Sequence, residues 1–433
     1  MFEVETLRGQ LEEKSRAVLA KNLIETAGML FHQPAPGLYQ SLFAWDSGWH
    51  IIALSILDPE LAFRELETLL SFQHADGSIP HEVRIKGLEK TETLLRRIYV
   101  CHVGGQFDGE GRSRFIDPPS YLLAAEFLYR RTADRRILAL LPKLRRCLDY
   151  LTEERNLFGD GLVAILHPWE SGTDNAPVYD IPCGIDIRRP WWPLTYEMVY
   201  TRYLKRLIEA GWNPHTIIRD KGFVFEDVGM NGLTAAGALA LARLYRAAGD
   251  EVSASVCDHK ARIIIAACEQ ILWNDKRGFF YPRWNLEHPK QSFRTCLNGM
   301  APLLTGLVDP AKADRVFDVY LASPRHFACK GGVAFNSRSE EDLVFFPNLM
   351  LWRGPCMWIS MNWIAAEAAA VYGKHGLASD ITAKTARLIA ENGFREYYDP
   401  YTGKGMGAQD FTWPTLVVDM IDRHGLDFRK GET

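Results

Sequence analysis

The sequence lacks the features that mark a membrane protein, a nucleic-acid-binding protein or a secreted protein. No apolar run approaches the length of a membrane-spanning helix. Lys and Arg total 50 against 54 Asp and Glu, so there is no basic excess for binding nucleic acid. The first residues mix charged and apolar side chains, where a signal peptide would need an uninterrupted apolar stretch. We therefore expect a water-soluble, cytoplasmic protein whose partner is a small molecule rather than a nucleic acid or a membrane.

The signatures of metal-dependent and covalent catalysis are also missing. The 8 cysteines are scattered without a C-x-x-C pair, and no histidines have H-E-x-x-H spacing. There is no G-x-S-x-G nucleophile motif and no G-x-x-x-x-G-K-[ST] phosphate loop. We expect buried free thiols, histidines with structural or hydrogen-bonding roles, and neither a metal nor another cofactor.

Helical periodicity, by contrast, covers most of the chain, and strand-like alternation is rare and short. Strong patterns predict helices over Glu5–Met29, Pro59–Phe72, Ser120–Arg131, Asp134–Glu153, Leu194–Ala210, Val228–Ala248, Glu251–Leu272, Pro310–Leu321, Trp358–Tyr372 and Leu377–Asn392. Weaker ones cover Asp46–Ser55, Phe293–Leu304 and Pro414–Asp422. These make roughly a dozen helices, or six antiparallel pairs. Six hairpins closed in a ring form an all-α (α/α)6 toroid.

The long connections between these helices carry the aromatic and carboxylate clusters. The longest are 30–45, 73–118, 154–193, 273–292 and 323–357, and we expect them to line a cleft at one end of the ring. Many of the 12 Trp lie there beside Gly, Asp or Pro, an arrangement typical of sugar-binding clefts. Because no linker of biased composition divides the chain, we expect a single domain over residues 1–433.

Two carboxylate clusters suit glycoside hydrolysis, which needs a protonated acid and a second carboxylate. The segment Leu166-His-Pro-Trp-Glu-Ser-Gly-Thr-Asp-Asn-Ala-Pro177 offers either Glu170 or Asp174 as the acid, although Asp174 also suits an Asx-type turn. The segment Gly393-Phe-Arg-Glu-Tyr-Tyr-Asp-Pro offers Glu396 as the base that activates water. Asp399 in the same segment is more simply the first residue of a turn.

Two further segments place polar residues among tryptophans. Phe43-Ala-Trp-Asp-Ser-Gly-Trp-His50 puts Asp46 where it either caps a helix that begins at Ser47 or binds sugar hydroxyls. Trp352-Arg-Gly-Pro355 puts Arg353 beside an expected helix start, with Pro355 in the first turn. Arg353 would then either orient a catalytic carboxylate or clamp a substrate.

Together these segments resemble the catalytic domain of glycoside hydrolase family 63, in its short bacterial branch of mannosylglycerate and glucosylglycerate hydrolases. A more distant resemblance is to the family 37 trehalases. The matching motifs follow one another in order: Phe43-Ala-Trp-Asp-Ser, Asp76-Gly-Ser-Ile-Pro-His, Asp117-Pro-Pro, His167-Pro-Trp-Glu-Ser-Gly-Thr-Asp-Asn, Glu226-Asp-Val-Gly-Met-Asn231, Trp352-Arg-Gly-Pro and Arg395-Glu-Tyr-Tyr-Asp-Pro.

This resemblance implies an (α/α)6 toroid and hydrolysis with inversion of configuration. The family's general acid, in W-E-S-G-x-D-N, maps onto Asp174, and its general base, in E-x-Y-D, maps onto Glu396. Positions expected to surround the sugar map onto Trp45, Asp46, Trp169, Glu170 and Arg353, with Trp413 as a weaker match.

Three positions depart from the family pattern. Asp117 stands where the glycerate-specific relatives carry a glutamine that helps hold the leaving group. If Asp117 faces the cleft, its charge would repel a glycerate carboxylate unless Arg188 or Arg189 compensates. Trp358 lies one position later than expected, and Pro414 replaces a small or polar residue.

The sequence thus predicts an inverting, exo-acting α-glycosidase. Its substrate would be a small α-glucoside or α-mannoside, either of the glucosylglycerate and mannosylglycerate type or a gluco-disaccharide. One alternative is a sugar epimerase or isomerase on a helical toroid, which would rely on His50 or His167 to move a proton. The other is a carbohydrate-binding protein without activity. The sequence leaves the sugar, the leaving group and the oligomeric state open.

Overall fold

Helices form most of the structure. The computed structural model describes residues 2–85, 105–189, 192–220, 222–285, 288–340 and 351–426. The α-helices are α1 (Phe2–Asn22), α2 (Ala44–Leu57), α3 (Pro59–Ser71), α5 (Ser120–Thr132), α6 (Arg135–Ala139), α7 (Leu141–Asp149), α8 (Asp180–Cys183), α9 (Trp192–Glu209), α10 (Pro214–Arg219), α11 (Val228–Ala248), α12 (Glu251–Ala267), α13 (Pro310–Arg315), α14 (Ile359–Val371), α15 (His375–Asn392) and α16 (Val417–His424). The 3-10 and π segments are η1 (Tyr150–Glu154), η2 (Pro168–Ser171), η3 (Pro177–Tyr179), η4 (Cys268–Leu272), η5 (Leu297–Thr305), η6 (Val316–Leu321), η8 (Leu351–Arg353) and η9 (Trp413–Leu416).

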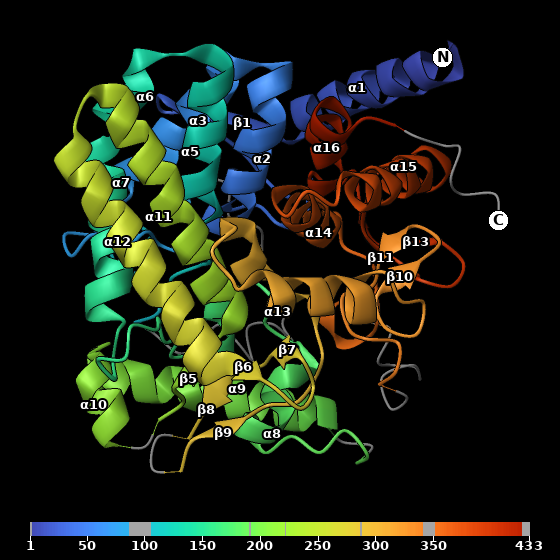
Figure 1. Cartoon of the computed structure of the whole chain (residues 1–433). Helices are drawn as coiled ribbons and strands as arrows, with labels where there is room; N and C mark the ends of the chain where they lie inside the picture. The colour runs from blue at the N-terminus through green and yellow to red at the C-terminus, as the bar shows by residue number, and fades with distance from the viewer. Residues whose placement is uncertain are drawn as a thin grey trace.

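Six helical segments form a closed inner ring. In order they are α2, α5, α11, η5, α14 and the η9–α16 unit; each packs against the next, and η9 and α16 return to α2. Outside this ring α3 packs on α2, α12 on α11 and α15 on α14, while α1 packs on α16. Figure 1 shows α11 and α12 side by side on one flank and α14, α15 and α16 on the other. The predicted helical toroid is therefore confirmed.

The burial of each helix follows from its position in the toroid. All of α2 except Ile56 is buried, because an inner helix meets neighbours on every side. In contrast, α3 buries one face only, and Asp58 caps it by accepting a hydrogen bond from Leu61 N–H.

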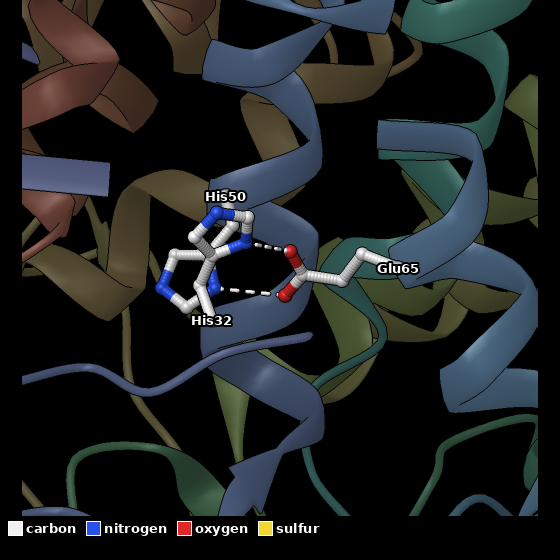
Figure 2. Close-up of side chains that lie close together, drawn as sticks. All are labelled: His32, His50 and Glu65. Atoms are coloured by element: carbon white, nitrogen blue, oxygen red, sulfur yellow. Dashed lines mark hydrogen bonds and ion pairs between the residues drawn. The ribbon is translucent and has the colours of Figure 1, made fainter. Parts of the chain in front are cut away.

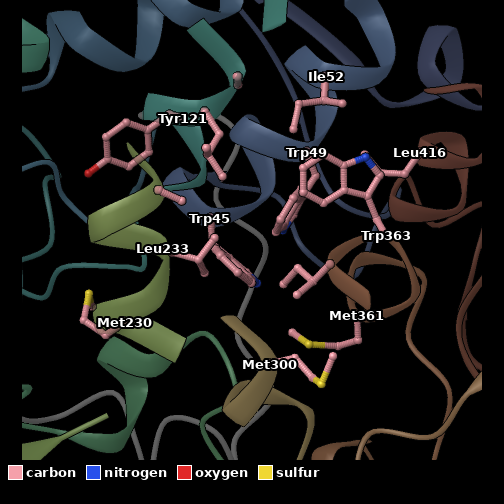
Figure 3. Packing of buried hydrophobic residues seen from close by; sticks show 14 of the residues in the cluster. Trp45, Trp49, Ile52, Tyr121, Met230, Leu233, Met300, Met361, Trp363 and Leu416 are labelled. Atoms are coloured by element: carbon pink, nitrogen blue, oxygen red, sulfur yellow. The ribbon is translucent and has the colours of Figure 1, made fainter. Parts of the chain in front are cut away.

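Large aromatic side chains fill the space inside the ring. Trp49 of α2 packs edge-on against Trp363 of α14, with ring centroids 5.3 Å apart, and both are fully buried (Figure 3). The indole N–H of Trp363 donates to Asp419 of α16 over 2.7 Å, and Arg131 of α5 donates to the same carboxylate over 2.6 Å. Asp419 therefore connects three members of the inner ring.

Three helix predictions need correction. The first helix ends at Asn22 instead of Met29, because Ala27 and Gly28 adopt φ values of 47° and 80° and turn the chain into a hairpin of β1 (Leu23–Thr26) and β2 (Met29–His32). The expected helix over Asp134–Glu153 is divided at Leu140 because Pro142 follows, within the first turn of α7. In place of a helix over Phe293–Leu304 the chain forms the 3-10 segment η5, which contains Pro302.

The strands are short, as expected from the sequence. They are β1, β2, β3 (Leu42–Phe43), β4 (Glu82–Val83), β5 (Phe225–Glu226), β6 (Trp273–Asn274), β7 (Phe279–Phe280), β8 (Arg283–Trp284), β9 (Lys290–Gln291), β10 (Ala328–Cys329), β11 (Gly332–Val333), β12 (Arg395–Tyr398) and β13 (Gly405–Gln409). Among the described residues they form antiparallel pairs and one three-stranded sheet of β5, β8 and β9. In Figure 1 the strands β5, β8 and β9 lie with α8, α9 and α10 at one end of the molecule. Among the described residues, no helix is long and apolar enough to cross a membrane.

Candidate active site

A pocket of about 730 Å³ opens among the long connecting segments. This volume lies in the range of small-molecule sites. Seven of the nine residues predicted for the site line it: Trp45, Asp46, Asp117, Trp169, Asp174, Glu396 and Trp413. They come from the start of α2, the segment before α5, the loop around η2, the strand β12 and the segment η9, which are far apart in the sequence.

Glu396 is held in the pocket by an irregularity of the β12–β13 hairpin. The strand register shifts between Arg395 and Tyr397, so Glu396 has no cross-strand partner in the ladder. Its Oε1 accepts from the Tyr39 hydroxyl and its Oε2 from the Ala408 backbone N–H, both over 2.8 Å. Burial raises the pKa of Glu396 above its usual value, and these two donors act in the opposite direction.

Asp174 lies in a tight turn beside the tryptophans. Ala176 N–H donates to the Thr173 carbonyl, so Asp174 is a central residue of a backbone turn and not the side-chain acceptor of the Asx-type turn considered from the sequence. The Tyr200 hydroxyl donates to the Asp174 backbone carbonyl over 2.6 Å. Burial raises the pKa of the Asp174 carboxyl to about 6, so a larger fraction of it is protonated near neutral pH than of an ordinary aspartate.

The loop that carries Asp174 requires a glycine at position 172. Gly172 has a φ of 69°, in the left-handed region. A Cβ atom there would lie 3.1 Å from the ring of Trp45, so a side chain would push the indole away. The sequence Ser-Gly-Thr-Asp thus allows Trp45 to approach the Asp174 loop closely.

Glu170 does not line the pocket, which corrects our expectation that it contacts the sugar. Its carboxylate is 1% exposed and forms a bidentate ion pair with Arg155 over 2.7 and 2.9 Å. It also accepts from the backbone N–H of Leu166 over 2.7 Å. Because its acceptor positions face these partners, Glu170 fastens the base of the loop that carries Asp174.

Arg353 likewise lies behind the pocket wall rather than in it. It is 1% exposed, and its guanidinium forms a bidentate pair with Asp180 over 2.6 and 2.8 Å. It also donates to the Asn175 carbonyl, while Trp352 N–H donates to the Asn175 side chain. Of the two roles considered for Arg353, the contacts fit orientation of the Asp174 loop. The adjoining helix α14 begins at Ile359, later than the Pro355 that we expected in its first turn.

Asp46 does not cap α2, because that helix begins at Ala44 and not at Ser47. Asp46 lies in the first turn and accepts from the indole N–H of Trp413 over 2.7 Å. Burial, with the nearby charge of Asp117, raises the pKa of Asp46 to about 8. This pKa favours the neutral acid at pH 7, which can donate a hydrogen bond as well as accept one.

Asp117 faces the pocket, but its charge is compensated by a residue that we did not expect. Its Oδ1 lies 2.8 Å from His81 Nδ1, and its Oδ2 accepts from Trp45 N–H at the start of α2. Burial alone would lower the pKa of His81, but Asp117 outweighs that effect and raises the pKa to about 9. Arg188 is exposed and pairs with Asp186 instead. Arg189 is exposed as well and also lies near Asp186.

The aromatic wall of the pocket includes residues that we did not predict as part of the site. Trp352 stacks on Trp358 with ring centroids 3.7 Å apart and an interplanar angle of 9°, and both line the pocket. Trp352 belongs to the motif Trp352-Arg-Gly-Pro, so the sequence did contain a signal that could have identified it as a site residue. Tyr39 belongs to a loop without a local signal, and only the folded chain shows that it bonds Glu396.

Neither histidine named for the epimerase alternative lines the pocket. His167 donates through Nε2 to the Tyr200 carbonyl and accepts Trp169 N–H at Nδ1. Burial lowers the pKa of His167 to about 3. His50 is fully buried between Glu65 and Thr412. Both ring nitrogens of each histidine thus have hydrogen-bond partners within the protein, and the structure gives the epimerase alternative no support.

Among the described residues, the cluster with side chains and spacing suited to a metal ion is His32, His50 and Glu65. None of the three lines the pocket. The cysteines in the described ranges are free and buried, and Cys101 lies outside those ranges. Parts of the long connections 73–118, 154–193, 273–292 and 323–357 lie outside them too.

Comparisons with known proteins agree on one family. The model described as the mannosylglycerate hydrolase MGH1-like glycoside hydrolase domain matches residues 39–414. A mannosylglycerate hydrolase from Thermus thermophilus is 29% identical over 90% of this chain and 95% of its own. A glucosylglycerate hydrolase from Mycolicibacterium hassiacum is 25% identical over 89% and 92%. The crystal structure of a family 63 mannosylglycerate hydrolase from Thermus thermophilus with glucose has a TM-score of 0.77 at 26% identity, covering 95% of this chain and all of that one.

Proposed function

This chain belongs to the mannosylglycerate hydrolase MGH1-like family of glycoside hydrolases, and we propose that it cleaves a small α-glucoside or α-mannoside with inversion of configuration. The observation that carries the proposal is that Asp174 and Glu396 come from segments far apart in the sequence and line one aromatic pocket. Within this pocket the surroundings of the two carboxyl groups differ. Asp174 has a raised pKa of about 6, whereas Glu396 accepts two hydrogen bonds.

In the proposed reaction Asp174 protonates the glycosidic oxygen as the bond to the anomeric carbon breaks. Glu396 removes a proton from a water molecule that attacks the opposite face of the sugar. The Tyr39 hydroxyl and Ala408 N–H favour the charged form of Glu396, which is the form a base requires. Because one displacement occurs, the product is released with the opposite anomeric configuration.

We propose that the sugar is bound between the tryptophans by apolar stacking and by polar groups at its edge. Trp45, Trp169 and Trp413 supply flat faces, and the neutral Asp46 supplies a hydrogen bond. Its partner Trp413 holds this carboxyl in one orientation. An exo-acting enzyme removes a single terminal residue, and this is the mode of action that we propose.

The leaving group that we favour is a glycerate, as in the substrates named for the relatives. The expected repulsion by Asp117 is offset, because the His81 imidazolium pairs with it and Trp45 N–H donates to it. A neutral sugar as leaving group, as in a gluco-disaccharide, is the competing substrate type.

The test is release of free hexose from glucosylglycerate, mannosylglycerate, trehalose, isomaltose, kojibiose and sucrose. We expect one or both glycerate glycosides to be cleaved fastest. ¹H NMR of the early product should show the β-anomer from an α-glycoside. Retained configuration would contradict the proposed mechanism. Cleavage of the disaccharides alone would contradict the assignment of glycerate as the leaving group.

A further inference from the structure

Three fully buried titratable side chains meet outside the pocket lining. His32 of β2 and His50 of α2 each direct Nδ1 at a different carboxylate oxygen of Glu65 of α3, over 2.6 and 2.9 Å (Figure 2). All three side chains have an exposed fraction of zero. The reaction described above uses none of them, although burying three such groups is costly unless they are paired.

The cluster continues towards the pocket through Thr412. The second ring nitrogen of His50, Nε2, lies 2.6 Å from the Thr412 hydroxyl oxygen. Thr412 directly precedes Trp413, whose indole N–H donates to Asp46. Asp46 and His50 are four residues apart on α2 and therefore lie on the same side of that helix. The segment 411–413 is thus fastened to α2 at two points one helical turn apart.

The same segment also contacts the strand that carries Glu396. Phe411 N–H donates to the Phe394 carbonyl over 3.2 Å, just before β12 begins. Thr412 N–H donates to the Pro34 carbonyl over 3.0 Å, in the loop that leads to Tyr39. A shift of Thr412 would therefore be transmitted to several sides of the pocket.

We propose that His32, Glu65, His50 and Thr412 form a hydrogen-bonded relay whose members are positioning residues, setting the place of Trp413 and Asp46 in the sugar-binding pocket. Glu65 fixes the orientation of the His50 ring, and this ring fixes Thr412 and the residue that follows it. The role in substrate binding rests on the proposed function, whereas the effect on the position of Trp413 does not.

The distances favour hydrogen bonds over a metal ion in the cluster. A zinc ion lies about 2.0–2.2 Å from each ligand, which separates neighbouring ligand atoms by about 3.4 Å in a tetrahedral site. The two contacts of Glu65 are shorter, at 2.6 and 2.9 Å, and match direct hydrogen bonds. Elemental analysis of the purified protein should therefore find no metal in stoichiometric amount, and one metal ion per chain would overturn the relay.

Thr412→Val is the sharpest variant, because it keeps the shape of the side chain and removes the hydroxyl. Thr412→Ser keeps the hydroxyl and should have the properties of the wild type. Thr382→Val is the matched control, since Thr382 is also fully buried and its hydroxyl donates to the Ala378 carbonyl within α15. Circular dichroism and thermal melting would establish that all three variants are folded.

The first readout requires no substrate. With ¹⁵N-labelled tryptophan, the indole N–H signals of the 12 Trp are observed, and the signal lost in Trp413→Phe identifies Trp413. Thr412→Val should shift this signal, and Thr412→Ser and Thr382→Val should not. An unshifted signal in Thr412→Val would overturn the relay whether or not the protein hydrolyses any of the glycosides tested.

The second readout uses the glycoside that the wild type cleaves fastest. Loss of the hydroxyl should raise KM about fivefold with kcat within about twofold, as expected for one lost hydrogen bond that positions the bound sugar. A merely structural role would lower the amount of folded enzyme, and thus the apparent kcat, at unchanged KM. An unchanged KM in Thr412→Val would therefore overturn the relay's role in binding, and absence of turnover in the wild type would instead contradict the proposed function.

Discussion

Asp174 and Glu396 have different surroundings, and the proposed mechanism gives the two carboxyl groups different tasks. Asp174→Asn removes the proton donor with little change of shape. We expect kcat to fall by about 10²–10⁴-fold on a glycoside with an alcohol leaving group, since that is what a general acid contributes. A glycoside with an acidic phenol as leaving group should lose far less, because its oxygen needs no proton. The matched control is Asp399→Asn, where the side chain only accepts from Tyr401 and Thr402 N–H in a turn, and near-normal activity in Asp174→Asn would refute the assignment.

The two raised pKa values also predict the pH dependence. The proposed mechanism requires Asp174 protonated and Glu396 charged, so kcat/KM should fall as the pH rises through about 6, the pKa of Asp174. On the acid side it should fall below the pKa of Glu396, which burial raises above its usual 4.5. A steady-state pH profile measures both limbs. A flat profile between about pH 5 and 9 would show that these groups do not limit the reaction.

The neutral Asp46 gives a prediction about stability. Its pKa is about 8 in the folded protein against 3.8 for the ordinary group, so the folded state binds the proton more tightly than the unfolded state does. The folded protein therefore loses stability as the pH rises from about 4 to 8. Asp46→Asn cannot ionise, and its carbonyl can still accept from Trp413. We expect the melting temperature of the variant, relative to that of the wild type, to be higher at pH 9 than at pH 5. A difference in melting temperature that does not depend on pH would contradict a raised pKa of Asp46.

At the scale of elements, the β12–β13 hairpin places the proposed base through its glycines. Gly407 has a φ of 64°, and a Cβ atom there would overlap Oε2 of Glu396. Gly407→Ala should therefore displace the carboxylate and lower kcat by at least about tenfold, a cost of about 1.4 kcal/mol in the barrier. Gly403→Ala is the control, because its φ of 78° carries the same backbone strain and its Cβ would meet only Leu388 and Asn392. Equal kcat values in the two variants would remove this role from Gly407.

The elements that the sequence predicted well are those with local start and stop signals. The helix α11 runs over Val228–Ala248 as predicted, because Asp227 caps it and Gly249 ends it in the left-handed conformation. The buried ion pairs could not be predicted from the sequence. Arg353 and Asp180 are 173 residues apart, and no local pattern indicates that they meet. For the same reason the motifs identified Glu170 and Arg353 as part of the site without showing that they support it from behind.

At the scale of the whole molecule, Asp419 joins α5, α14 and α16 across the ring. Asp419→Ala would leave Arg131 and the Trp363 indole without this acceptor, and we expect a loss of about 3 kcal/mol in the free energy of unfolding. Asp422→Ala removes the other carboxylate of Arg131, which is more exposed, and should cost less than about 1 kcal/mol. Chemical denaturation would measure both values. Similar losses in the two variants would show that closure of the ring does not depend on Asp419.

Closure of the ring also determines when the pocket is assembled during synthesis of the chain. The contacts Tyr39 to Glu396, His50 to Thr412 and Asp46 to Trp413 span 357, 362 and 367 residues. A nascent chain on the ribosome carries the Asp174 loop long before it carries the partners of Tyr39, His50 and Asp46. Under the proposed mechanism the pocket is therefore complete only after residues 396–413 have left the ribosome, and a truncated translation product that stops before residue 396 lacks the proposed base and cleaves no glycoside.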